Sequence, residues 1–243
     1  FLFEGGAEYY ASFGGERMRS GARIVSTAGN QAAHEVRIVV TGPAGKVVTP
    51  PTVMVLKSVA GEEAQSSDSW IPPDATGPFR VTVELVRDGK VIDRLAHEVN
   101  IWRPNPMPHF ITTRDGDFWL NGKKWYAHGV NYMPSSGIGI EDGEYFEYWL
   151  NPRSYDPDII ERDLADCEAM GLNAVSIFQY HRSLSSRNLI DLLVRCRNHK
   201  LKVNLSLRPG TPMDFPWDTV REMIEQGRLA ENDDIFVYDL AWE

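Results

Sequence analysis

The clearest candidate for a catalytic group is Glu243, the last residue of the sequence. The residues before it, 236–242, form an apolar run of the kind found in buried parallel strands covered on both faces. A carboxylate held at the carboxyl end of such a strand can donate or accept a proton in catalysis. The plainer alternative is that Glu243 is only the first residue of a solvated loop. The strands and helices predicted for the preceding residues help to decide between these two interpretations of Glu243.

A further set of residues lies near the ends of predicted strands and offers hydrogen-bonding or stacking groups. Aromatic rings beside polar side chains can bind a ligand that presents both apolar faces and hydrogen-bonding groups. For each aromatic residue the alternative is packing within the protein core. The candidates for substrate binding are His128, Asn131, Tyr132, Tyr180, His181, Arg208 and Trp242.

The first hundred residues lack any helical pattern. Residues 8–102 form short runs of alternating apolar and polar side chains, separated by turns that contain Gly and Pro. Asp88-Gly89 between two such runs is a two-residue hairpin signal. This pattern predicts an all-β, immunoglobulin-like sandwich over residues 1–103.

A proline-rich segment separates this part from the rest of the chain. Three prolines fall within residues 104–108, where they prevent both helix and sheet from continuing. We therefore place a linker at 104–109. The Asn121-Gly122 pair that follows is a second hairpin signal.

Beyond this hairpin, strand-like and helix-like segments alternate to the end of the chain. The predicted strands cover residues 126–132, 172–180, 201–208 and 236–243, and helices are expected to begin near residues 156, 186 and 218. This order predicts parallel strands joined by right-handed crossovers. We therefore expect a multidomain chain in which residues 110–243 form the first half of a (β/α)8 TIM barrel.

Composition and charge narrow the class of partner. The 243 residues are 42% apolar and 24% charged, which is typical of a globular protein. The formal net charge of -9 argues against nucleic acid or an anionic membrane surface as the main partner. No stretch approaches the roughly 20 apolar residues that a membrane span requires.

No group of residues has the spacing of a metal or cofactor site. Cys167 and Cys196 fall in predicted helices without CxxC or Cys/His spacing, so we expect two buried thiols. The loop at residues 133–155 contains several acids, but they lack the regular spacing of a calcium loop. Its length and aromatic content predict a wall beside a binding cleft instead. We expect no metal and no cofactor.

Three segments together resemble the opening of clan A glycoside hydrolases, with families 2 and 5 the nearest. They are residues 118–123 with the sequence FWLNGK, residues 128–132 with HGVNY, and residues 161–175, which begin with ERDL and end with GLNAV. The resemblance covers about residues 114–243. In these families a sandwich domain often precedes a (β/α)8 barrel.

The resemblance implies a retaining glycoside hydrolase that cleaves O-glycosidic bonds in a β-linked oligo- or polysaccharide without a cofactor. In these enzymes a glutamate at the end of strand four is the acid/base, and a second glutamate on strand seven is the nucleophile. Glu243 would be the acid/base, and the nucleophile would lie beyond it. The chain would then be truncated after strand four and inactive by itself. The resemblance slightly favours an extracellular or periplasmic location.

This chain departs from the family pattern in three places. Ser176 stands where many members have Arg near the end of strand two. Arg208 follows Leu207 where family 5 often has His at the end of strand three. Trp242 replaces the Asn that usually precedes the acid/base. The alternative is therefore a noncatalytic carbohydrate-binding or adhesion protein with a degenerate barrel, and the sugar, the linkage and the oligomeric state stay open.

Overall fold

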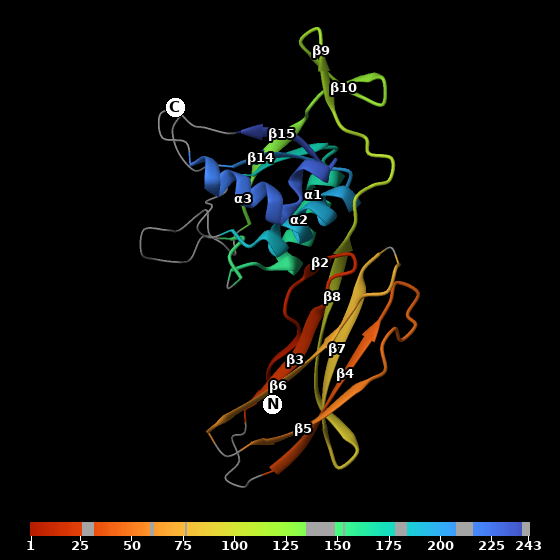
Figure 1. Cartoon of the computed structure of the whole chain (residues 1–243), viewed down its shortest axis with the longest axis vertical. Coiled ribbons are helices and arrows are strands. Elements are labelled where there is room, and N and C mark those ends of the chain that lie inside the picture. Colours follow the sequence, from red (N-terminus) through yellow and green to blue (C-terminus); the bar gives the residue numbers. More distant parts are fainter. Residues whose placement is uncertain are drawn as a thin grey trace. The chain divides into compact units, whose positions relative to one another are not determined.

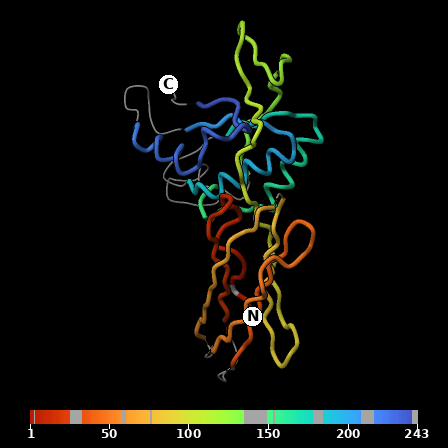
Figure 2. Tube along the Cα trace, turned by 45° about the vertical axis from the view of Figure 1, so that its right-hand side comes forward, coloured from red at the N-terminus to blue at the C-terminus, as the bar shows by residue number. Residues whose placement is uncertain are grey.

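The computed structural model describes residues 1–25, 32–58, 61–75, 77–134, 149–152, 154–177, 184–207 and 216–239. The chain divides into two compact units, Phe1–Arg103 and Pro104–Glu243. The first unit consists of strands, and the second combines a small antiparallel meander with a parallel sheet and helices (Figure 1, Figure 2).

The strands of the first unit form two sheets. They are β1 (Leu2–Ala7), β2 (Ala11–Phe13), β3 (Met18–Val25), β4 (Ala32–Thr41), β5 (Thr52–Ser58), β6 (Glu63–Trp70), β7 (Phe79–Arg87) and β8 (Lys90–Trp102). One sheet has the order β1-β3-β6 and the other the order β2-β8-β7-β4-β5. The pairs are antiparallel, except that β2 runs parallel to β8. The described part of this unit contains no helix, which confirms the all-β prediction, while the immunoglobulin-like class stays a prediction.

Alternating side chains along these strands build the core of the first unit. In β7, Val81 and Val83 are fully buried, and they pack with Ile24 from the other sheet. The turn that joins β7 to β8 has a φ of 49° at Asp88 and 74° at Gly89. Positive φ at both central residues is the backbone that an Asp-Gly hairpin requires, so the predicted turn is confirmed.

The second unit begins with a three-stranded antiparallel meander. Its strands are β9 (Thr112–Arg114), β10 (Asp117–Leu120) and β11 (Lys123–Trp125), with β10 in the middle. The φ angles of Asn121 and Gly122 are 54° and 75°, which confirms the predicted hairpin between β10 and β11.

A four-stranded parallel sheet follows, with helices between its strands. The elements are β12 (Gly129–Tyr132), α1 (Pro157–Ala169), β13 (Ala174–Ile177), α2 (Ser186–Asn198), β14 (Lys202–Ser206), α3 (Trp217–Gly227), the 3-10 helix η3 (Leu229–Glu231) and β15 (Ile235–Asp239). The strand order is β12-β13-β14-β15, and all three pairings are parallel, as the alternation of segments predicts.

Local signals account for the limits of α1. The Asp156 carboxylate accepts hydrogen bonds from the backbone N–H groups of Asp158 and Ile159 at 3.0 and 3.1 Å, and Pro157 takes the first helical position. After the helix, Gly171 has a φ of 76°, which stops the helical backbone. Among the described helices none is long and apolar enough to cross a membrane.

The two faces of the parallel sheet differ. Figure 1 shows α1, α2 and α3 on one side of the sheet, and the side chains that point there, such as Ile177 and Leu205, are fully buried. On β15 only Ile235 is fully buried, and Val237 is half-buried. Tyr238 is 38% exposed, so the described part of β15 is only partly buried, and the prediction of a strand covered on both faces stays a prediction.

Candidate functional site

Polar side chains gather on the sheet face that points away from the helices. Paired residues of adjacent parallel strands share a face, and the register pairs Asn131 with Ser176 and Ser176 with Asn204. Two residues after Asn204 on β14, Ser206 pairs with Asp239 of β15. Because Asn204 and Ser206 are two residues apart on β14, both sets lie on the same face. We call these five residues the polar rows, and they lie toward the carboxyl ends of the strands.

Strict alternation along β14 produces this arrangement. Val203, Leu205 and Leu207 are fully buried against the helices, while Asn204 and Ser206 point the other way. The sequence analysis did not identify the polar side chains of β14 or Asp239 as site residues. The signal was present, because a strand covered on both faces by apolar groups would not alternate in this way.

The hydrogen bonding within the polar rows is incomplete. The Asn204 Nδ2 atom donates to the Ser176 hydroxyl at 3.1 Å. Among the residues that the structure describes, the Asn204 Oδ1 and Ser206 Oγ atoms have no hydrogen-bond partner, although both atoms are buried. A buried polar atom without a partner costs about 1–3 kcal/mol, so such atoms are retained where a ligand or water can bond to them.

His128 lies at the opposite end of the strand from the place predicted for it. β12 begins at Gly129, so His128 precedes the amino end of the strand and is about 13 Å from its carboxyl end. Its backbone N–H donates to the Asn173 side chain at 2.8 Å, and Asn173 Nδ2 donates to the Tyr126 carbonyl at 2.9 Å. Asn173 thus fixes the start of β12, and the structure does not bring His128 together with Asn131.

Tyr132 also differs from its prediction, because it faces the helices. Its hydroxyl donates to the Asp163 carboxylate at 3.3 Å, and its ring packs edge-on against Trp149 with 5.8 Å between centroids. Burial and the nearby Asp163 raise the pKa of Tyr132, which therefore keeps its proton. Its neighbour Asn131 is exposed on the other face, as the alternation of strand side chains requires.

The remaining predicted site residues lie outside the described part of the chain. They are Tyr180, His181, Arg208, Trp242 and Glu243, together with most of the loop at residues 133–155.

The described residues show no cluster of three or more His, Cys, Asp or Glu side chains that could hold a metal. Cys167 and Cys196 are free and buried, as predicted. Burial raises the pKa of the Cys196 thiol, so this residue does not supply a thiolate nucleophile near neutral pH.

A network of polar and charged side chains joins α1 to α2. Its members are Tyr155, Glu161, Glu168, Asp191, Arg195, His199 and Lys200, and we call it the helix network. At its centre Arg195 donates from Nε to Asp191 and from Nη1 to Glu161, each at 2.7 Å. Tyr155 donates its hydroxyl to the same Asp191 carboxylate at 2.5 Å. The network thus links the two helices that precede β13 and β14 in the chain.

His199 makes the helix network sensitive to pH. Its ring nitrogens lie 2.9 Å from a carboxylate oxygen of Glu168 and 2.9 Å from one of Glu161, and the protonated ring can donate to both. Burial by itself would lower the pKa of His199, but the two carboxylates outweigh it and raise the pKa. A raised pKa in the folded state means that this stabilisation is complete below about pH 6.5 and is lost as the pH rises through the folded value.

We therefore expect the stability of the second unit to fall as the pH is raised above about 6.5, and a His199→Gln variant to lack this fall. The measurement is urea unfolding of the chain between pH 5.5 and 8.5, followed by hydrogen exchange in α1 and α2. A His128→Gln variant, which changes an exposed histidine, is the matched control and should keep the pH dependence. Equal pH profiles for His199→Gln and the original chain would contradict the assignment.

The chain is similar in sequence to a known glycosidase. No family model matches the chain. A β-glucuronidase of Bacteroides fragilis is 27% identical over 114 residues, which are 46% of this chain and 14% of that protein. The chain thus matches only a small part of this relative's length.

Several solved structures that are similar to the chain are glycosidases. One is a glycosyl hydrolase family 2 member from Bacteroides cellulosilyticus, with 14% identity and a TM-score of 0.42, which covers 98% of this chain and 31% of that one. Another is a Bacteroides uniformis β-glucuronidase, with 16% identity and a TM-score of 0.42, which covers 98% of this chain and 26% of that one. The chain therefore spans less than a third of the length of these two proteins.

Proposed function

We propose that this chain is part of a retaining glycoside hydrolase that cleaves a β-linked oligo- or polysaccharide. The observation that carries the proposal is the parallel sheet, whose strands follow one another in sequence order with helices on one face and the polar rows on the other. A doubly wound sheet would reverse its strand order and carry helices on both faces. A sheet wound in one direction supports the proposal of the first half of a (β/α)8 barrel, a fold whose active site lies at the carboxyl ends of the strands.

The polar rows suit the floor of a sugar-binding cleft. Asn131 is exposed on this face, and Asn204 is half-buried there beside the Ser176 hydroxyl. Amide and hydroxyl groups match the hydroxyls of a pyranose ring, which can both donate and accept hydrogen bonds.

The acid/base of this proposal is Glu243. It follows Asp239 by four residues in the sequence, and the resemblance to clan A glycoside hydrolases gives it this role. A retaining enzyme needs two carboxyl groups about 5 Å apart. In the families that the sequence resembles, the second carboxylate is a glutamate on strand seven, so the nucleophile of this proposal would follow Glu243 in the parent protein.

In this mechanism Glu243 protonates the glycosidic oxygen while the nucleophile attacks the anomeric carbon. The C–O bond breaks, the alcohol leaves, and a glycosyl ester forms on the enzyme. Glu243 then removes a proton from water, which attacks the anomeric carbon and releases the sugar with its original configuration. The partial identity to a protein named β-glucuronidase supports this class of reaction.

The test is product stereochemistry. The full-length parent protein, supplied with a panel of p-nitrophenyl β-glycosides, should release the β-anomer first, as followed by proton NMR, while the 243-residue chain alone should be inactive. Release of the α-anomer would contradict the retaining mechanism. Saccharide binding by the parent without turnover would favour the noncatalytic carbohydrate-binding alternative.

A further inference from the structure

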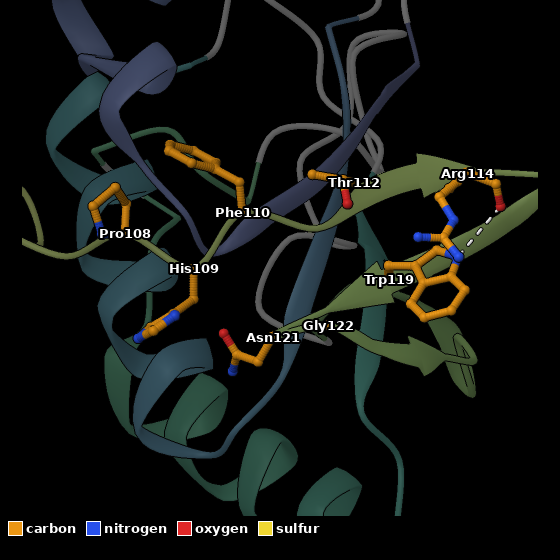
Figure 3. A pocket seen from close by; sticks show the side chains of 8 residues that line it. All are labelled: Pro108, His109, Phe110, Thr112, Arg114, Trp119, Asn121 and Gly122. Atoms are coloured by element: carbon orange, nitrogen blue, oxygen red, sulfur yellow. Dashed lines mark hydrogen bonds between the residues drawn. The ribbon is translucent and has the colours of Figure 1, made fainter.

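The β9–β11 meander carries a second concave site, which the proposed active site does not use. A cavity of about 350 Å³ lies between the linker around His109 and the hairpin turn at Asn121 (Figure 3). This volume falls at the lower end of the range for small-molecule sites. Figure 3 shows the Asn121 side chain extending from the turn toward His109, with Trp119 and Arg114 further along the groove.

The two faces of the meander carry different aromatic side chains. Phe118 and Trp125 pair across β10 and β11 and pack against Phe236 of β15, with centroid distances of 5.7 and 5.1 Å. Trp119 pairs with Thr112 of β9 and points to the opposite face. The core of this unit therefore does not require Trp119, although it is the largest side chain on the outer face of the meander.

Contacts within the groove hold Trp119 and Arg114 in place. The Arg114 guanidinium lies over the indole ring, 4.5 Å from its centroid, and the Trp119 Nε1–H donates to the Arg114 carbonyl at 3.3 Å. A guanidinium stacked on an aromatic ring keeps its in-plane N–H groups available for other acceptors. The guanidinium thus covers one face of the fixed indole ring, so a ligand would have to stack on the opposite face, with the guanidinium N–H groups as hydrogen-bond donors beside it.

The linker side of the groove is anchored as well. The His109 backbone N–H donates to the Asp233 carboxylate at 2.8 Å, and Asn105 Nδ2 donates to the same oxygen at 3.2 Å. Phe110 follows and is 42% exposed beside the cavity. Because the backbone is held, these side chains are arranged before any ligand binds, which reduces the entropy lost on binding.

The charges of the outer face are balanced. Lys124 pairs with Asp117, and Arg114 Nε lies 3.4 Å from the Asp115 carboxylate. A face without excess positive charge, on a chain with a net charge of -9, does not favour an anionic polymer. An aromatic ring beside amide, imidazole and guanidinium groups instead matches the CH face and hydroxyls of a neutral sugar.

We propose that this groove binds a neutral pyranose saccharide, with Trp119 as the stacking platform and Asn121, His109 and Arg114 as partners for its hydroxyls. The groove lies on the meander and the polar rows lie toward the carboxyl ends of the parallel strands, so binding here does not depend on the proposed hydrolase activity. In a protein that acts on polysaccharides, such a site would bind a second part of the polysaccharide.

The test is an NMR titration of the 243-residue chain with cellohexaose and, separately, with xylohexaose. At least one probe should shift the indole N–H resonance of Trp119. A Trp119→Ala variant should weaken binding, measured on the amide resonances of Asn121 and Gly122, by about three- to tenfold. Asn121→Gly keeps the positive φ of the turn and removes the amide side chain, so it should weaken binding without unfolding the hairpin.

Tyr126→Ala is the matched control, because Tyr126 is a 70% exposed aromatic residue outside the groove, and this variant should bind as the original chain does. The proposal is overturned if neither probe shifts the Trp119 resonance, or if Asn121→Gly binds with unchanged affinity. It is also overturned if Trp119→Ala leaves saccharide binding unchanged and only removes a broadening of the NMR lines that increases with protein concentration. The groove would then be a contact between copies of the protein.

Discussion

Replacing Glu243 by glutamine in the full-length parent protein should abolish cleavage of glycosides with poor leaving groups and largely spare activated aryl glycosides. An alkoxide leaves only if it receives a proton, and a general acid contributes about 10²- to 10⁴-fold to such a step. A nitrophenolate leaves with little protonation, so the first step no longer depends on the acid. The measurement is kcat/KM for a β-linked disaccharide and for the matching p-nitrophenyl glycoside.

Glu225→Gln provides the control, because Glu225 is an exposed residue of α3 and its loss should leave both rates unchanged. If Glu243→Gln hydrolyses both kinds of substrate at the original rate, Glu243 is not the acid/base. The carbohydrate-binding alternative, which the replacement of the usual Asn by Trp242 suggests, would then gain support.

Replacing Asp191 by alanine should lower the free energy of unfolding of the second unit by about 3 kcal/mol. Asp191 is completely buried, and its carboxylate accepts hydrogen bonds from both Arg195 and Tyr155. Removing one member of a buried ion pair costs about 3–5 kcal/mol, because the remaining charge stays buried without its partner. We expect the lower end of this range, since Glu161 still pairs with Arg195 at 2.7 Å.

The measurement is urea unfolding of the 243-residue chain, with hydrogen exchange in α1 and α2 as the readout for this unit. Asp218→Ala removes an exposed carboxylate that lies 3.2 Å from Arg221, and this control should change stability by less than about 0.5 kcal/mol. A triple variant with Tyr155→Phe, Asp191→Leu and Arg195→Met removes the whole polar group and should recover part of the loss. If Asp191→Ala and Asp218→Ala lower the free energy of unfolding by the same amount, the buried ion pair contributes no more to stability than the exposed one.

Features that depend on neighbouring residues could be determined from the sequence alone. The Asp88-Gly89 and Asn121-Gly122 turns need positive φ at adjacent positions, which these residue pairs tolerate. The start of α1 at Asp156 depends on a carboxylate that reaches N–H groups two and three residues further on. The succession of such local elements was sufficient to predict parallel strands.

Which face a side chain takes was decided only by the tertiary structure. Strand side chains alternate with a period of two, so the point at which β12 begins determines that Asn131 is exposed and Tyr132 lies under the helices. The same start leaves His128 before the strand. If β12 were shifted by one residue, Asn131 and Tyr132 would exchange faces. Sequence patterns locate the ends of an element only to within about two to four residues, which is not accurate enough to decide this.

The polar rows and the helix network also required the fold, because their members come from separate elements. Asn131, Ser176 and Asn204 become neighbours through the register of three strands. Arg195 and Glu161 are 34 residues apart and meet because α1 packs beside α2. The sequence determined which polar residue types were available, and the packing of helices on one face of the sheet decided which of them share the opposite face.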